Sequence, residues 1–281
     1  MIQESFPAMG TTVTAVVEDG TGTQRCRSLF AAVEARLSRF LPDSHLSLLN
    51  RDPAPVVDVP PTLAAVLTAA QSLMERTDGL VDPAVGSAVT AWGYDRTFSE
   101  VEQGRPSPSP LRRGSWQIEG TTLRRTPGTR FDLGGIAKGW TADLAVERGL
   151  ALMVSAGGDI RSATDDAVVE ILDPEGTIAA RVRLGRGALA TSSVAKRRWR
   201  TSDGEANHII DPRTMEPTRS PIVAASAACA TAAESEAAAK AILLLGADGL
   251  RWAAERSWIE AALVVWHDAS VFATRGWEMA A

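Results

Sequence analysis

The residues best suited to chemistry lie near the middle of the chain, at residues 131–143 (FDLGGIAKGWTAD). The glycine pair that begins at Gly134 predicts a tight turn with exposed N–H groups, and the sequence after it predicts a helix from about Ile136. A helix N-terminus attracts anions through its unsatisfied amides and its dipole, and Lys138 adds a full positive charge there. A second run, residues 156–159 (AGGD), again joins two glycines to a carboxylate. Two such runs favour an anion-binding site over a loop that only starts a helix.

Lysine is rare in this chain. Of its 29 basic residues only Lys138, Lys196 and Lys240 are lysines, and the others are arginines. These lysines lie in or beside the motif-like segments, and a compact ammonium does not substitute for a planar guanidinium in a tight site. The distribution is a hint that lysine has a specific role, with a codon bias toward arginine as the alternative explanation.

Four further segments group side chains that could act on a ligand. Residues 39–50 surround a predicted helix start with an aromatic and several short polar side chains, and residues 79–86 place a carboxylate at a helix cap. Residues 190–193 end a predicted strand with three hydroxyls. Residues 207–214 hold histidine, aspartate, arginine and threonine within one short stretch. Hydroxyl, carboxylate and imidazole groups are the usual agents of phosphate contact and proton transfer.

His208 is the best candidate for proton transfer. A lone histidine is more often a hydrogen-bonded residue of the core. The neighbouring residues of the HIIDPRT segment instead favour a role in proton acceptance or phosphate contact. The ordinary pKa of histidine, about 6.5, suits either role. His45 and His267 do not lie in a comparable polar motif, and we interpret both as surface or structural residues. For Asp159 and Asp211, capping of a turn explains the residue as well as a role in a site does.

The periodicity of apolar residues predicts the elements that position these groups. Predicted helices cover residues 25–40, 44–50, 61–76, 82–92, 136–148 and 232–245. Predicted strands cover residues 12–17, 116–118, 122–125, 152–155, 168–172, 178–184, 188–192 and 222–229, and three short elements follow at 249–256, 261–265 and 270–273. Residues 99–114 are rich in Pro, Ser, Gly and charge and predict an exposed loop. Helices and strands mix without strict βαβ alternation, which indicates an α+β fold with a largely antiparallel sheet.

Composition excludes several classes of protein. The chain has 281 residues, of which 45% are hydrophobic and 22% charged, and a net charge of −5, so nucleic acid is not an expected partner. No apolar run reaches the roughly 18 residues that span a bilayer. The first residues lack the features of a signal peptide, so we expect a cytoplasmic protein. Cys26 and Cys229 are predicted to be buried and free, which argues against a thiol-based or metal-based redox enzyme.

In their order, these segments resemble the FAD:protein FMN transferases, the ApbE-type flavin transferases. The resemblance runs from residues 6–11 (FPAMGT) to Gly246, and its most specific parts are residues 132–143, 156–159 and 208–214. It implies one compact domain over residues 1–281 with FAD in a central cleft. It also implies an activity: FAD is cleaved at its pyrophosphate, FMN is linked to a Thr or Ser hydroxyl of a target protein, and AMP is released, with Mg²⁺ as the usual metal.

The resemblance also assigns residues to the cofactor. It implies that Phe40 packs on the flavin in place of a tyrosine, so that a hydroxyl is lost, and that Trp140 offers a face to adenine. Lys138 is expected at a phosphate and Asp143 at the adenosine. The full set of expected cofactor contacts is Met9, Phe40, Val81, Asp82, Gly134, Lys138, Trp140, Asp143, Gly157, Gly158, Asp159, Thr191 and Ile210, with His208, Glu236 and Lys240 as expected catalytic residues.

The chain departs from the family at the implied metal site. Ala137 matches a carbonyl ligand, but Glu236 stands where an aspartate is usual and Lys240 where a threonine is usual. A protonated lysine has no lone pair and cannot be a ligand. Three interpretations follow: the Lys240 ammonium replaces part of the metal's function, Glu236 binds Mg²⁺ through waters with Lys240 at the edge, or the two residues form an ordinary i,i+4 ion pair.

Two other functions share the same contacts. An FAD pyrophosphatase would use water in place of the acceptor hydroxyl and release FMN and AMP. A non-catalytic FAD-binding or trafficking protein would have lost its metal and its chemistry, and the exchange at Glu236 and Lys240 favours it. Incubation with FAD and an acceptor protein would distinguish the three functions. A transferase would give FMN-modified protein, a pyrophosphatase would give AMP without modified protein, and a binding protein would give a stable FAD complex.

Overall fold

The computed structural model describes residues 1–173 and 176–277, and the chain forms two compact units. The first unit comprises residues 1–32, 136–196 and 220–281, and the second comprises residues 33–135 and 197–219. Both are assembled from segments that are remote in the sequence. Helix α1 (Gly20–Leu37) begins in the first unit and ends in the second.

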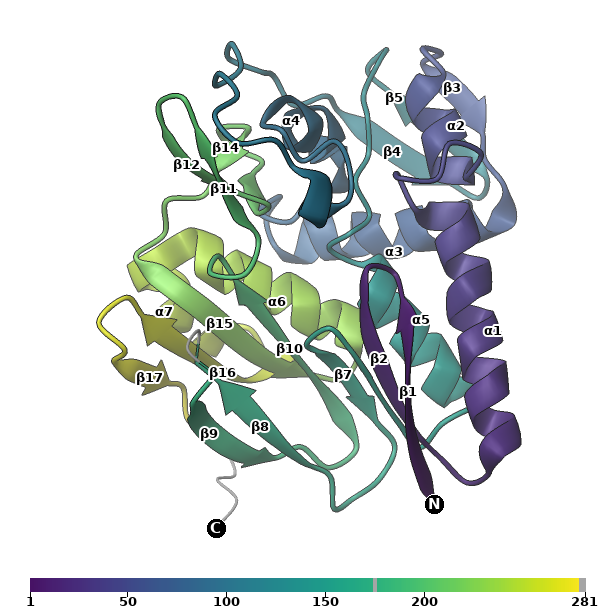
Figure 1. The fold of residues 1–281 in the computed structure, drawn as a ribbon, viewed down its shortest axis with the longest axis vertical. Coiled ribbons are helices and arrows are strands. Elements are labelled where there is room, and N and C mark those ends of the chain that lie inside the picture. The colour runs from purple at the N-terminus through teal and green to yellow at the C-terminus, as the bar shows by residue number, and fades with distance from the viewer. Residues whose placement is uncertain (174–175, 278–281) are drawn as a thin grey trace. The chain divides into compact units, whose positions relative to one another are not determined.

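An eight-stranded sheet is the centre of the first unit (Figure 1). Every neighbouring pair in it is antiparallel, which confirms the expected α+β fold with an antiparallel sheet. In spatial order the strands are β1 (Ile2–Ala8), β2 (Thr11–Val17), β6 (Met153–Ala156), β7 (Asp159–Ser162), β10 (Gly187–Ser193), β15 (Ile222–Cys229), β16 (Ile259–Trp266) and β17 (Val271–Ala273).

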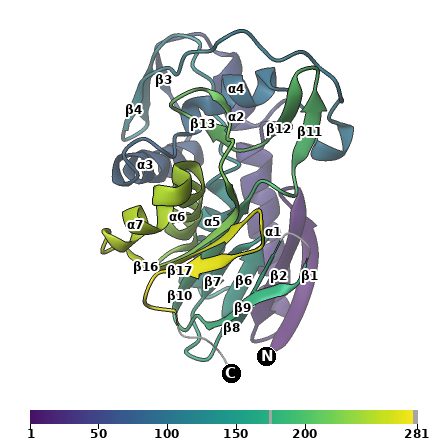
Figure 2. The same cartoon turned by 90° about the vertical axis from the view of Figure 1, so that its left-hand side faces the viewer.

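Two different layers cover the faces of this sheet. Successive side chains of a strand point to opposite faces, and Ala188 of β10 packs in a buried cluster with Val146 and Ala232 of the helices α5 (Ala137–Glu147) and α6 (Ala232–Leu245). Its neighbour Leu189 packs with Val169 of the hairpin formed by β8 (Val168–Leu172) and β9 (Ile178–Arg183). The helices therefore lie on one face and the hairpin on the other (Figure 2). A short helix, α7 (Gly249–Ala254), follows α6 after the 3-10 turn η3 (Gly246–Asp248).

Helices α5 and α6 approach each other closely at Gly139. A Cβ atom at Gly139 would lie 2.8 Å from the backbone of Ala232, so no larger residue fits without movement. Asp143, one turn further along α5, accepts hydrogen bonds from the first amides of α6. The start of α6 is thus fixed against α5.

The strand β1 is absent from the expectations drawn from the sequence. Pro7 lies within it, but β1 is an edge strand, where a residue without an N–H group is tolerated. The turn between β1 and β2 is Met9-Gly10, with φ angles of 51° and 67°, the left-handed conformation typical of two-residue hairpins.

The second unit is smaller and mixed. Its helices are α2 (His45–Arg51), α3 (Pro61–Arg76) and α4 (Gly86–Ala91), with 3-10 turns η1 (Pro83–Val85) and η2 (Phe98–Glu100). A three-stranded sheet has the order β3 (Val56–Asp58), β5 (Thr122–Arg125) and β4 (Trp116–Glu119). Two hairpins complete it, β11 (Arg198–Thr201) with β12 (Gly204–Asn207) and β13 (Ile210–Asp211) with β14 (Glu216–Pro217).

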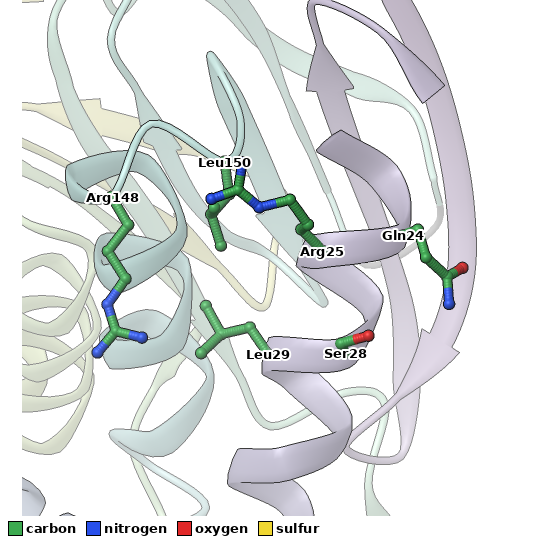
Figure 3. Close-up of a pocket in the computed structure, with 6 residues that line it drawn as sticks. All are labelled: Gln24, Arg25, Ser28, Leu29, Arg148 and Leu150. Carbon is green, nitrogen blue, oxygen red and sulfur yellow. The ribbon is translucent and has the colours of Figure 1, made fainter. Parts of the chain in front are cut away.

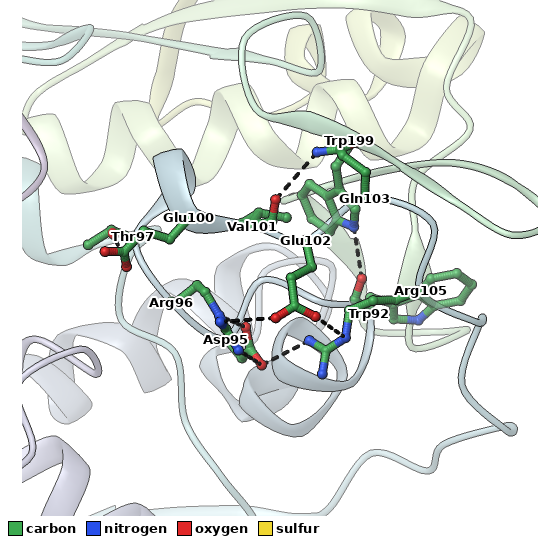
Figure 4. A network of polar contacts seen from close by, with 10 residues as sticks. All are labelled: Trp92, Asp95, Arg96, Thr97, Glu100, Val101, Glu102, Gln103, Arg105 and Trp199. Atoms are coloured by element: carbon green, nitrogen blue, oxygen red, sulfur yellow. Dashed lines mark hydrogen bonds and ion pairs between the residues drawn. The ribbon is translucent and has the colours of Figure 1, made fainter.

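Residues 101–115 of this unit contain neither helix nor strand, apart from one bridge between Arg105 and Thr201. Charged side chains hold the beginning of this stretch (Figure 4): Asp95 lies 3.0 Å from Arg96 and 2.9 Å from Arg105, and Glu102 lies 3.1 Å from Arg96. Because most of these side chains are exposed, such pairs add little to stability.

Two properties of the described residues bear on the class of protein. No helix in the described part of the chain is long and apolar enough to cross a membrane. Cys26 and Cys229 are both buried, as expected, and neither forms a disulfide with a described residue.

Candidate functional site

Four charged side chains form a cluster in the first unit: Lys138, Asp159, Glu236 and Lys240. The Lys138 ammonium lies 3.1 Å from Asp159 Oδ2 and 3.4 Å from Glu236 Oε1, and the Lys240 ammonium lies 3.9 Å from the same Glu236 oxygen. The carboxylates are almost fully buried, and the two lysine side chains are 15% and 19% exposed. Two ammonium and two carboxylate groups therefore share one buried region, which we call the lysine–carboxylate cluster.

Local structure brings these residues together. Lys138 lies in the first turn of α5, Glu236 and Lys240 lie one turn apart on α6, and the two helices meet at Gly139. Asp159 begins β7 directly after a two-residue turn of Gly157 and Gly158, whose φ angles are 67° and 107°. Both glycine-containing runs of the sequence thus supply a residue to one cluster.

Burial dominates the electrostatics of the cluster. Loss of water and the negative charge of Glu236 raise the pKa of Asp159, and the Lys138 ammonium opposes that shift. Glu236 Oε1 faces both lysines, whereas Glu236 Oε2 is buried and has no hydrogen-bond partner among the described residues. A buried carboxylate oxygen without a partner is costly, so this atom marks unused binding capacity.

The cluster does not fit a divalent metal ion. Mg²⁺ requires about six oxygen ligands, but the Ala137 carbonyl already accepts a hydrogen bond from Thr141 Oγ1 at 2.6 Å. Lys240 offers a positive charge in place of a lone pair, and Glu236 is paired with two ammonium groups. Across residues 1–173 and 176–277, no group of three His, Cys, Asp or Glu side chains comes together to hold a metal.

Asp143 is engaged by the protein itself. Its two oxygens accept hydrogen bonds from the amides of Ala232 (2.8 Å) and Ala233 (3.0 Å), and Arg161 lies 3.5 Å away. Burial raises the pKa of Asp143 to about 6, although both amides and Arg161 act in the opposite direction. The carboxylate caps α6, and its expected contact with adenosine stays a prediction. Arg161 was not identified from the sequence, because nothing in its local pattern indicates a partner on another element.

The remaining candidates of the first unit lie on turns and strands. Met9 occupies the β1–β2 turn and packs partly against the core, and Trp140 is half-buried on α5. Thr191 of β10 shares a hydrogen bond with Ser226 at 2.8 Å, and its amide donates to the Gly158 carbonyl at 3.3 Å.

In the second unit, Phe40 presents part of an aromatic ring to the surface, with 38% of the residue exposed. The Arg39 guanidinium lies 4.1 Å from the centre of that ring and 4.5 Å from the Tyr94 ring, and Arg39 Nε pairs with Asp132 at 2.7 Å. Cation–π contact on this scale fixes the orientation of a ring. Arg39 and Asp132 therefore hold Phe40 in place, a role not foreseen from the sequence.

Asp82 also has structural partners. Its Oδ1 accepts hydrogen bonds from the Ala84 amide at 2.8 Å and from Trp116 Nε1 at 2.9 Å, and Arg113 lies 3.4 Å from Oδ2. The cap at the start of η1 agrees with the helix-cap prediction. The amide of the neighbouring Val81 donates to Thr77 Oγ1 at 3.2 Å.

The turn at Gly134 differs in detail from the expected one. Gly134 does not have a positive φ, and its amide donates to Asp132 Oδ1 at 2.6 Å instead of facing outward unpaired. Just before the turn, Asn50 anchors the chain at Phe131. The Asn50 side chain donates to the Phe131 carbonyl at 2.8 Å and accepts from the Phe131 amide at 2.7 Å. Within this unit the run is anchored by side chains, not by glycine's conformational freedom.

The HIIDPRT segment folds into a compact turn. The Asp211 carboxylate accepts three hydrogen bonds from the Arg213 guanidinium, the shortest at 2.6 Å, and one from the Arg213 amide at 2.9 Å. His208 Nδ1 lies 3.4 Å from the Arg197 carbonyl, and Ile210 is buried in the core of the unit. Asp211 therefore caps a turn, the explanation that was left open for it.

Two surface pockets lie apart from these residues. One is a shallow depression in the first unit (Figure 3), lined by Gln24, Arg25, Ser28, Leu29, Arg148 and Leu150. The other lies in the second unit between residues 107–111, the β11–β12 hairpin and residues 214–216. Neither is lined by a candidate site residue.

The ApbE family model matches residues 9–263, so the chain belongs to the ApbE family. An FAD:protein FMN transferase of Rhodobacter capsulatus is 32% identical over 97% of this chain, and the chain spans 57% of that relative's length. Among solved structures, the ApbE protein of Thermotoga maritima has the same fold, with a TM-score of 0.84, 23% identity, and coverage of 98% of this chain and 97% of the other. The flavin transferase ApbE of Vibrio cholerae gives a TM-score of 0.79 and 25% identity, with the same coverage.

Proposed function

We propose that this protein is an FAD:protein FMN transferase. The observation that carries the proposal is the match to FAD:protein FMN transferases along almost the whole chain. It favours group transfer over FAD hydrolysis and over simple FAD binding, because the relatives are named as transferases.

The reaction requires a charged leaving group and an activated hydroxyl. An acceptor hydroxyl oxygen, from Thr or Ser, attacks the phosphorus of the FMN half of FAD. The bond from that phosphorus to the bridging oxygen breaks, AMP leaves with that oxygen, and the hydroxyl proton passes to a base. Such transfer depends on positioning and on stabilising the charge on phosphate oxygens.

Residues of each unit are assigned parts in this reaction. In the first unit we assign Lys138 to a phosphate oxygen, supported by its place in the first turn of α5. In the second unit we assign Phe40 to the flavin ring, supported by its exposed ring, and His208 to the acceptor proton. Asp82 and Asp143 are positioning residues in this scheme, since the oxygens of both already have protein partners.

Magnesium is not part of the proposed scheme, because the residues around Glu236 do not fit a divalent ion. The remaining cofactor contacts carried over by resemblance, and the cytoplasmic location, stay predictions. Cell fractionation would test the location.

Product analysis tests the proposal. The purified protein is mixed with FAD and a protein that contains a Thr or Ser flavin-acceptor motif, and nucleotides and protein are analysed separately. A transferase yields AMP and FMN-linked protein. Free FMN with AMP would identify a pyrophosphatase, and intact FAD held in a complex would identify a binding protein.

A further inference from the structure

We infer that the Lys240 ammonium, together with Lys138, binds the pyrophosphate of the nucleotide directly and takes the place of a divalent cation. This inference rests on the proposed function for the identity of the ligand. It concerns the lysine–carboxylate cluster, whose residues do not fit a metal ion.

The first argument is the state of Lys240. Its ammonium lies 3.9 Å from Glu236 Oε1, which is close enough for attraction but too long for a hydrogen bond. In the described part of the chain it makes no hydrogen bond, so its N–H donors are available. Its side chain is only 19% exposed, so its position is largely fixed. A fixed ammonium with unused donors is suited to a phosphate oxygen.

The second argument is the arrangement of the carboxylates. One oxygen of Glu236 lies near both ammonium groups, and Asp159 holds Lys138 from the other side. These carboxylates orient the two lysines. A divalent cation at Glu236 would lie beside two positive charges, whereas an anion would meet two attractive ones.

The third argument is the placement of lysine in the chain. Two of the three lysines in the sequence belong to this cluster, and the third, Lys196, is exposed. Lys196 is therefore a matched control for the loss of a lysine from the same unit.

The test is the affinity for FAD, measured by calorimetry on the full chain, with EDTA and then with Mg²⁺. We expect the wild type to bind FAD equally well in both. Lys240→Met keeps the length of the side chain, and we expect it to weaken FAD binding about tenfold or more in both conditions. Lys196→Met should bind FAD as the wild type does. Riboflavin, which has no phosphate, should bind Lys240→Met and wild type alike.

Two results would overturn the inference. One is FAD binding by the wild type that weakens at least about tenfold in EDTA and recovers with Mg²⁺, which is decisive even if Lys240→Met does not fold. The other is FAD binding by Lys240→Met that equals that of the wild type. Transfer of FMN to an acceptor separates this inference from the proposed function: metal-dependent binding with intact transfer refutes only the inference, and metal-free binding without transfer refutes only the function.

Discussion

Asp143 places a buried carboxylate at the start of α6, where it accepts two backbone amides. An aspartate in such a place is usually expected to stay ionised, but burial outweighs the amides and Arg161 and raises its pKa to about 6. The neighbouring charge of Glu147 adds to that shift. This residue therefore links helix capping to pH.

The pH dependence of stability follows from that pKa. The folded state holds the Asp143 proton more tightly than the unfolded chain does, so protonation of Asp143 stabilises the fold. This contribution to the free energy of unfolding is at most about 3 kcal/mol. It is fully present below about pH 4 and is lost as the pH rises through about 6. Asp143→Asn removes the titration. Urea unfolding of both proteins between pH 4 and 7 measures their free energies of unfolding. The value for the wild type minus the value for the variant should fall as the pH rises. A difference that is constant with pH would contradict this account.

Phe40 tests the flavin side of the proposal. Its ring is held by Arg39 and Tyr94, so removing it should cost stacking without unfolding the unit. Phe40→Ala is expected to weaken binding of both FAD and riboflavin about three- to tenfold. Phe98→Ala is the matched control, since Phe98 is 36% exposed, against 38% for Phe40, and contacts the same Tyr94 ring. Equal losses in the two variants would argue against a flavin contact at Phe40.

At this scale the sequence identified the residues of the lysine–carboxylate cluster but not their partners. Lys138, Asp159, Glu236 and Lys240 each lie in a motif that stands out locally. Arg161, Arg39 and Trp116 do not, because each acts through a contact with a residue on another element. The prediction at Gly134 was wrong in detail. The glycine pair predicted a turn with exposed N–H groups, but the Gly134 amide donates a hydrogen bond to Asp132.

Among the elements, α6 was predicted with its observed limits because its signals are local. Thr231 and Glu234 form a capping box at its start, and Gly246, with a φ of 60°, ends it. Helix α3 begins at Pro61 for a similar reason. Several strands were missed, among them β1, β7 and β11. Pro7 interrupts the first, the second has only four residues, and charged side chains dominate the third.

The contact between α5 and α6 gives a prediction about elements. Gly139→Ala would place a Cβ 2.8 Å from the Ala232 backbone, so we expect the free energy of unfolding to fall by about 1–3 kcal/mol. Gly20→Ala in α1 is the control, because a Cβ there would meet no described residue beyond its chain neighbours within 4 Å, and the variant should be neutral or slightly stabilising. Urea unfolding of both variants measures the difference. A neutral Gly139→Ala would show that the helices can separate at no cost.

For the whole molecule, the α+β class and the antiparallel sheet were predicted from the sequence and are confirmed. The match to the ApbE family model confirms the resemblance seen in the sequence. It did not predict the division into two compact units, because each unit joins segments that are far apart. Nothing local to residues 197–219 indicates that they pack with residues 33–135. A single domain over residues 1–281 with FAD in a central cleft stays a prediction.

The most direct test of the central claim is the intact mass of an acceptor protein after incubation with FAD and this protein. We predict that the acceptor gains the mass of one linked FMN and that one AMP appears for each modified molecule. An acceptor whose Thr or Ser is replaced by Ala should gain nothing. An acceptor of unchanged mass, with FAD either intact or hydrolysed to FMN and AMP, would contradict the account.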